Sequence, residues 1–257
     1  MSIAATALPA EAGQARRLPL PGGAMLCVAE RAETVSPAWF EPAHWLGRCR
    51  VHDTAGGRGG SLVIRSPIGP LLLRRYLRGG LAARLTRDRY LFRGEEATRS
   101  FREFRLLLAL AGRGLPVPLP VAAAYWRSGW SYRAAILLAF IPRARPLPLC
   151  FEELGAEDFR AIGAAVGRLH QAGVRHADLN AWNVLLDAER RVWIVDFDRA
   201  RLVGARAPRI AGAVLARLLR SLRKLAADRR VPGFAQRWRD LLAGHAEVLG
   251  NCRVRPS

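Results

Sequence analysis

The chain has 257 residues, of which 51% are hydrophobic, and 41 basic against 21 acidic residues give it a formal net charge of +20. This length and composition favour a globular protein with a sizeable core, and the longest apolar run, residues 134–142, is too short to span a bilayer. Such a positive charge favours polyanionic partners, among them nucleotides, phospholipids, nucleic acid and phosphorylated glycans.

The first half of the chain predicts a leader followed by a small strand-rich domain. Residues 1–35, rich in Ala, Pro and Gly, predict a poorly ordered leader, and residues 36–142 predict the domain itself. The first recognisable feature of this domain is a glycine-dense turn at 56–60. Strand-like runs lie at 62–64, 71–73, 121–126 and 132–140, and an amphipathic helix lies at 97–113.

The second half, residues 143–257, predicts a mostly helical domain behind a proline-rich hinge at 142–148. Apolar residues at helical spacing run from Phe159 to Leu169, and Gly173 is suited to end that helix in the left-handed conformation. Two apolar runs at 184–186 and 192–195 around a polar turn predict a hairpin, and a basic amphipathic helix follows at about 210–226.

The segment around this hairpin carries the residue types that phosphoryl transfer requires. His176-Ala177-Asp178 begins a loop that contains Asn183, and Asp196-Phe197-Asp198 follows the hairpin. Asp178 is the candidate base for an acceptor hydroxyl, while Asn183 and Asp196 are candidate oxygen ligands of Mg²⁺. The structural alternative makes them turn and strand-end residues. We predict His176 to be a buried residue that hydrogen-bonds the loop rather than a catalytic base.

The first half contains candidate phosphate contacts. Protein kinases place a strand lysine on the phosphates and pair it with a helix glutamate, but the first lysine of this chain is Lys224. Arg74 follows the apolar run at 71–73 and takes the lysine's position, with Glu103 of the predicted helix as its partner, whereas Arg75 is an alternative on the opposite face. The backbone amides of the glycine-dense turn are a further candidate phosphate contact. The candidate residues in this turn are Gly57, Arg58 and Gly59.

Several sequence blocks resemble one family of sugar kinases. These blocks are residues 73–81, 88–92, 101–105, 114–118, 176–180 and 193–199, and the similarity runs from about residue 55 to 226. They are similar to the 3-deoxy-D-manno-octulosonic acid (Kdo) kinases of Gram-negative bacteria. The resemblance implies an α+β, bilobal protein-kinase-like fold with a small strand-rich N-lobe and a mostly helical C-lobe. The stretch after Asp196 is short and lacks Ala-Pro-Glu, so a long activation segment is not expected.

The same resemblance implies the substrates and the location. The family uses ATP to phosphorylate the 4-hydroxyl of Kdo on lipid A, in lipopolysaccharide core synthesis at the cytoplasmic face of the inner membrane. Kdo–lipid A and an anionic membrane surface are therefore the expected partners, and nucleic acid is not. Peripheral association is expected, with the apolar stripe of the helix at 210–226 packed on the protein core or laid on the membrane.

Three other functions are compatible with the sequence. The chain resembles other kinase-like phosphotransferases too, such as heptose or antibiotic kinases. Its arginine content and the aromatic residues Trp126, Trp130 and Tyr132 are compatible with a nucleic-acid-binding protein. The missing strand lysine is compatible with a pseudokinase, although Asp178, Asn183 and Asp196 argue against it.

Overall fold

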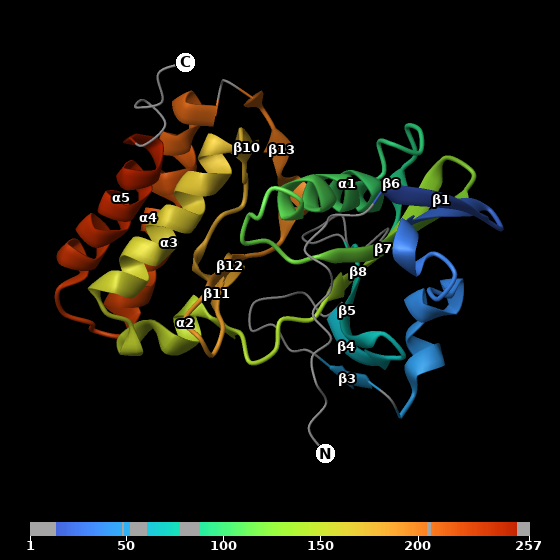
Figure 1. Ribbon diagram of the computed structural model, residues 1–257, viewed down its shortest axis with the longest axis horizontal. Coiled ribbons are helices and arrows are strands. Elements are labelled where there is room, and N and C mark those ends of the chain that lie inside the picture. The colour runs from blue at the N-terminus through green and yellow to red at the C-terminus, as the bar shows by residue number, and fades with distance from the viewer. Residues whose placement is uncertain (1–13, 48, 52–60, 78–87, 205–206, 251–257) are drawn as a thin grey trace. The chain divides into compact units, whose positions relative to one another are not determined.

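The computed structural model describes residues 14–47, 49–51, 61–77, 88–204 and 207–250 (Figure 1). The chain forms two compact units. Unit 1 consists of residues 1–114 and 118–140, and unit 2 of residues 115–117 and 141–257. The described residues contain an antiparallel sheet and five α-helices, which agrees with the mixed α and β composition that the sequence predicts.

Unit 1 is built on one antiparallel sheet. Its order is β1-β2-β7-β8-β5-β4-β3, and β6 pairs with β8 beside that path. Every neighbouring pair is antiparallel, and β7 and β8 form its longest hairpin. The strands are β1 (Ala15–Leu20), β2 (Gly23–Val28), β3 (Cys49–Val51), β4 (Ser61–Ser66), β5 (Gly69–Arg75), β6 (Tyr90–Leu91), β7 (Pro120–Ser128) and β8 (Ser131–Ala139).

The N-terminal hairpin differs from the poorly ordered leader that the sequence predicts up to residue 35. β2 pairs with β7 along 23–27, and Met25, Leu26 and Cys27 are almost fully buried. Gly23 allows this pairing, because a β-carbon there would overlap the carbonyl oxygen of Tyr125. Pairing with a distant strand therefore orders a segment whose local composition favours a loop. Residues 1–13 lie outside the described part of the chain.

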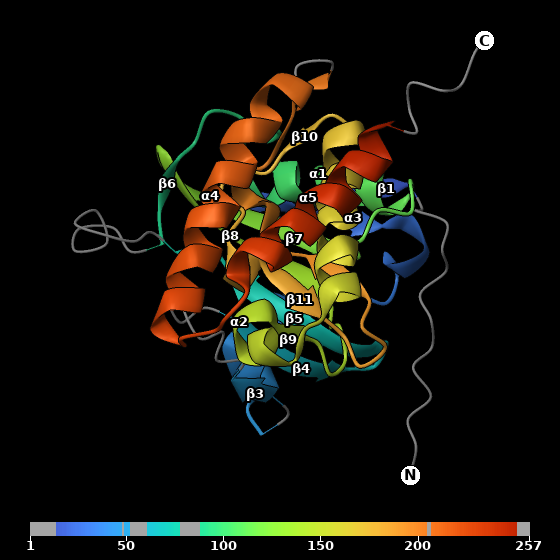
Figure 2. The same cartoon turned by 90° about the vertical axis from the view of Figure 1, so that its left-hand side faces the viewer.

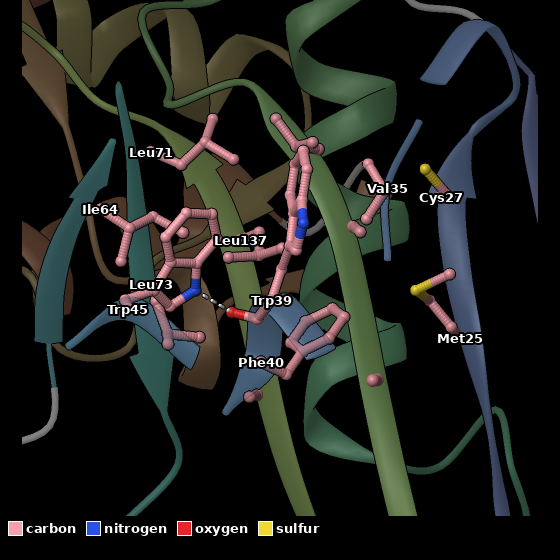
Figure 3. Packing of buried hydrophobic residues seen from close by; sticks show 14 residues of the cluster. Met25, Cys27, Val35, Trp39, Phe40, Trp45, Ile64, Leu71, Leu73 and Leu137 are labelled. Atoms are coloured by element: carbon pink, nitrogen blue, oxygen red, sulfur yellow. Dashed lines mark hydrogen bonds between the residues drawn. The ribbon is translucent and has the colours of Figure 1, made fainter. Parts of the chain in front are cut away.

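A hydrophobic cluster covers one face of this sheet (Figure 3). Leu71 and Leu73 of β5 enter it together with Trp39 and Trp45, which belong to the 3-10 turns η2 (Pro37–Phe40) and η3 (Pro42–Trp45). The indole of Trp45 donates a 2.9 Å hydrogen bond to the carbonyl of Trp39, so its buried N–H has a partner. Side chains alternate along a strand, so Arg74 lies on the other face of the sheet, where helix α1 (Arg99–Ala111) packs against β7 and β8.

Unit 2 is mainly helical. A three-stranded sheet of order β12-β11-β9 and a pair of short strands, β10 and β13, accompany its helices. In chain order its elements are β9 (Arg145–Pro146), α2 (Leu147–Cys150), α3 (Ala156–Gln171), β10 (Val174–Arg175), β11 (Val184–Leu186), β12 (Val192–Ile194), β13 (Arg201–Leu202), α4 (Ala207–Asp228) and α5 (Phe234–Gly250).

Helices α3 and α5 lie against each other at unusually short range (Figure 2). A β-carbon on Gly163 would overlap the backbone of Leu241, and one on Gly244 would overlap the backbone of Arg160. The glycines of both helices thus allow the backbones to touch. At the far end of this interface the rings of His170 and His245 meet, with Nδ1 of His170 2.8 Å from Nε2 of His245.

The local predictions for unit 2 are largely confirmed. α3 covers the predicted apolar stripe, and Gly173 has φ +78°, as a left-handed helix end requires. The predicted hairpin is β11 and β12, with Val184 opposite Ile194. None of the helices in the described ranges is long and apolar enough to cross a membrane.

Candidate active site

The loop that contains Asp178 is held by its own side chains. The amide nitrogens of Asn180 and Asn183 each donate a 2.9 Å hydrogen bond to the backbone carbonyl of Asp178. The side-chain oxygen of Asn180 also accepts from the N–H of Trp182 and caps the 3-10 turn η6 (Ala181–Asn183). These bonds fix the backbone and leave the Asp178 carboxylate, 27% exposed, at the surface of unit 2.

His176 is buried, as predicted, and its ring hydrogen-bonds Val195 after β12. Its residue is 2% exposed, its Nε2 lies 3.0 Å from the carbonyl oxygen of Val195, and its ring packs edge-on against Phe197. Burial lowers the pKa of His176, so the neutral ring donates this bond at neutral pH. The histidine thereby joins the Asp178 loop to the strand end that carries Asp196.

The β11–β12 hairpin brings Asp196 back to the same loop. The N–H of Val195 donates to the carbonyl of Asn183 at 3.0 Å, so Asp196 directly follows a residue bonded to the loop. Asp187 holds the hairpin turn by accepting bonds from the N–H groups of Glu189 and Arg191. Asp196 itself has φ +65°, a left-handed conformation uncommon outside glycine that is often found at functional turns.

Helix α4 contributes a contact that the sequence did not reveal. Nη2 of Arg217 donates to Oδ1 of Asp178, and the guanidinium side chain remains 45% exposed. One turn further along, the hydroxyl of Ser221 accepts from the N–H of Ala181 at 3.1 Å. α4 is therefore anchored to the loop at two points, and Arg217 is the cation nearest to the candidate base in these contacts.

Unit 1 contains the predicted arginine–glutamate pair. Nη2 of Arg74, on β5, forms an ion pair with Oε2 of Glu103, on α1, and the hydroxyl of Tyr76 donates to the same oxygen at 2.7 Å. The Glu103 side chain is 1% exposed and that of Arg74 17%. The pair has the partners that the kinase comparison predicts, with a guanidinium in place of the ammonium group.

The other phosphate candidates have different outcomes. Arg75 lies on the same face of β5 as Leu71 and Leu73, with a 41% exposed side chain that reaches Asp88 at 3.4 Å. Arg133 of β8 lies 3.0 Å from the same carboxylate. Arg75 therefore pairs with Asp88 and not with Glu103, the partner of Arg74. Gly57, Arg58 and Gly59 lie outside the described residues.

The donor set near Asp178 fits a magnesium ion. Asn183 uses its amide nitrogen on the Asp178 carbonyl, so a ligand role would fall to its neutral side-chain oxygen, and Asp196 would supply an anionic oxygen. Mg²⁺ usually takes one or two such protein ligands and completes its shell with water and phosphate oxygens. In the described part of the chain, His, Cys, Asp and Glu side chains form no group of three or more that suits a metal.

A loop aspartate, an asparagine five residues on and an aspartate after the next hairpin are the features of a kinase-type phosphotransferase. The model of the lipopolysaccharide kinase (Kdo/WaaP) family matches residues 43–244. The chain belongs to this family.

Curated relatives agree with this assignment. A 3-deoxy-D-manno-octulosonic acid kinase of Xanthomonas axonopodis pv. citri (strain 306) is 46% identical over 208 residues, or 80% of this chain and 83% of that protein. One of Stenotrophomonas maltophilia (strain K279a) is 45% identical over 212 residues, or 81% and 84%.

Proposed function

We propose that this chain is a Kdo kinase that transfers the γ-phosphoryl group of ATP to the 4-hydroxyl of Kdo on lipid A. Membership of the lipopolysaccharide kinase family and 46% identity to a named Kdo kinase support the reaction. The observation that carries the chemistry is the partly exposed Asp178 carboxylate on a loop that Asn183 braces and that bonds to Val195, the residue before Asp196.

In this proposal Asp178 orients the acceptor hydroxyl and receives its proton. The acceptor oxygen forms a bond to the γ-phosphorus as the bond to the leaving ADP oxygen breaks. Asn183 and Asp196 hold Mg²⁺, which neutralises negative charge on the phosphates. The bond from His176 to Val195 keeps the two parts of this site in register.

Arg74 is proposed as the phosphate contact of unit 1, with Glu103 and Tyr76 fixing its guanidinium. The glycine turn that includes Gly57, Arg58 and Gly59 is proposed to cover the phosphates. Units 1 and 2 then correspond to the N-lobe and C-lobe of a bilobal kinase, with residues 36–142 and 143–257 as the predicted domains. The short connection from Asp196 to α4 supports an acceptor other than a peptide.

The exposed side of α4 supports a peripheral position at the inner face of the inner membrane. Arg217, Arg220, Arg223 and Lys224 are all exposed, whereas Val214, Leu218 and Leu222 are buried in unit 2. The apolar stripe thus packs on the protein, and the cationic side is available to the phosphates of lipid A and to anionic lipids.

The test incubates the purified protein with γ-labelled ATP, Mg²⁺ and Kdo–lipid A in detergent micelles. We expect labelled phosphate on the Kdo 4-hydroxyl, located by NMR, and a loss of about 10²- to 10⁴-fold in Asp178→Asn, because a general base is removed. Equal label in the wild type and Asp178→Asn would overturn the assignment of the base. Transfer only to a heptose acceptor would overturn the substrate.

A second variant separates the metal site from the base. Asp196→Asn exchanges an anionic ligand for a neutral one, so we expect it to need a higher Mg²⁺ concentration for half-maximal activity. Normal turnover with an unchanged Mg²⁺ dependence would show that Asp196 is not a ligand.

A further inference from the structure

Arg217 is the feature of unit 2 that the proposed reaction leaves unexplained. Its guanidinium contacts Oδ1 of Asp178, the carboxylate proposed to receive the acceptor proton. The transfer of the acceptor proton to Asp178 does not itself require a cation in this place. Its position beside the acceptor hydroxyl indicates a different role.

The geometry leaves both partners with binding capacity. Asp178 accepts the arginine on one oxygen, and the loop asparagines bond to its backbone rather than to its second carboxylate oxygen. A guanidinium has five N–H donors, and Nη2 of Arg217 supplies the hydrogen bond to Asp178. With 45% of its side chain exposed, Arg217 is accessible to a ligand.

We infer that Arg217 is the specificity residue for an acidic sugar and binds the carboxylate of the acceptor while Asp178 binds its hydroxyl. This inference rests on the proposed Kdo kinase activity. The relatives' substrate is named an octulosonic acid, and a guanidinium fork matches a carboxylate in geometry as well as charge.

The contact between Arg217 and Asp178 also specifies which hydroxyl reacts. In Kdo the carboxylate is carbon 1, carbon 2 is the glycosidic centre and carbon 3 carries no hydroxyl. The 4-hydroxyl is therefore the free hydroxyl nearest to the carboxylate along the carbon chain. A cation hydrogen-bonded to the base places these two groups of the sugar side by side, and the more distant hydroxyls lie away from Asp178.

The backbone of α4 holds Arg217 in this position. Ser221 lies four residues later on the same side of the helix and bonds to the N–H of Ala181, inside the loop that carries Asp178. Leu218 and Leu222, which directly follow Arg217 and Ser221 in the chain, are fully buried, so the helix cannot turn about its axis without exposing them. Arg217 is thus presented by a rigid element, as a specificity residue requires.

The test compares two acceptors across matched variants. The acceptors are Kdo–lipid A in detergent micelles and the same compound with the Kdo carboxylate converted to its methyl ester. In the wild type we expect kcat/KM to be about 10- to 100-fold higher for the acid, because a charge-assisted hydrogen bond strengthens binding by about this factor. In Arg217→Gln this preference is expected to fall to about 3-fold or less, through a higher KM for the acid.

Arg223→Ala is the control, because Arg223 is an exposed cation of the same helix about 120° around its axis. It is expected to keep the preference for the acid. Equal losses on acid and ester in Arg217→Gln would mean that Arg217 only positions Asp178, and would overturn the inference while leaving the kinase intact. If the wild type phosphorylates neither acceptor, the proposed function itself fails.

Discussion

The ion pair between Arg74 and Glu103 makes a sharp prediction about stability. Glu103 is 1% exposed and Arg74 17%, so neither charge is fully hydrated once its partner is removed. Breaking a buried pair from one side costs about 3–5 kcal/mol, whereas replacing both members by apolar residues of similar volume is often close to neutral. We therefore expect Arg74→Met and Glu103→Leu to be destabilising singly and to be much less so together.

The exposures also rank the two single variants. Arg74→Met leaves a carboxylate in the more buried position, where it still accepts a 2.7 Å hydrogen bond from the neutral Tyr76 hydroxyl. Glu103→Leu leaves a guanidinium that still reaches solvent. Arg74→Met should therefore cost more. A loss of about 3 kcal/mol lowers the urea midpoint by about 1.5 M, given a slope near 2 kcal/mol/M.

The assay is urea unfolding followed by tryptophan fluorescence, because Trp39 and Trp45 lie in the core of the same unit. The control is Arg75→Met, which removes the adjacent arginine with its 41% exposed side chain and its long, 3.4 Å contact to Asp88. It should cost less than about 1 kcal/mol. Additive effects of the two single changes, with a coupling below about 0.5 kcal/mol, would refute the reasoning.

Two further predictions concern unit 2. Burial, with a smaller contribution from His245, lowers the pKa of His170 from 6.5 to about 4. The unfolded state then binds more protons between these values, so the free energy of unfolding should fall by about 3 kcal/mol as the pH drops from 6.5 to 4 and stay level above 7. Urea unfolding at a series of pH values should show that this free energy depends less on pH in His170→Gln. An unchanged pH dependence would contradict the assignment. Gly163→Ala should cost about 1–3 kcal/mol in thermal or urea unfolding, because α3 and α5 must separate. Gly212→Ala, with open space around it in α4, should stabilise slightly, and equal effects would exclude close packing as the cause.

Local patterns were sufficient for the elements that carry the candidate site. The alternation of the β11–β12 hairpin and the glycine after α3 each depend on neighbouring residues, so the sequence displays them directly. The Arg74–Glu103 pair spans 29 residues and was still predictable, because a kinase strand and helix supply the expected partners.

The contacts that the sequence missed depend on distant partners. Met25 and its neighbours become a strand by pairing with β7, and no nearby residue signals that pairing. Arg217 lies 39 residues from Asp178, and the helical pattern of α4 identifies only its buried stripe. The available signal was Ser221, the one hydroxyl residue of α4, which lies one turn from Arg217.

The position of α4 connects these observations to the acceptor. In protein kinases a long segment after the metal-binding aspartate holds the peptide, and phosphorylation often orders that segment. Here α4 begins at Ala207, shortly after Asp196, and its own side chains reach the Asp178 loop. We infer that a preformed helix, rather than an ordered loop, builds the acceptor side of this site. Such a site needs no activating phosphorylation, so phosphatase-treated protein should be as active as the untreated protein, and a loss of activity after phosphatase treatment would contradict this view of α4.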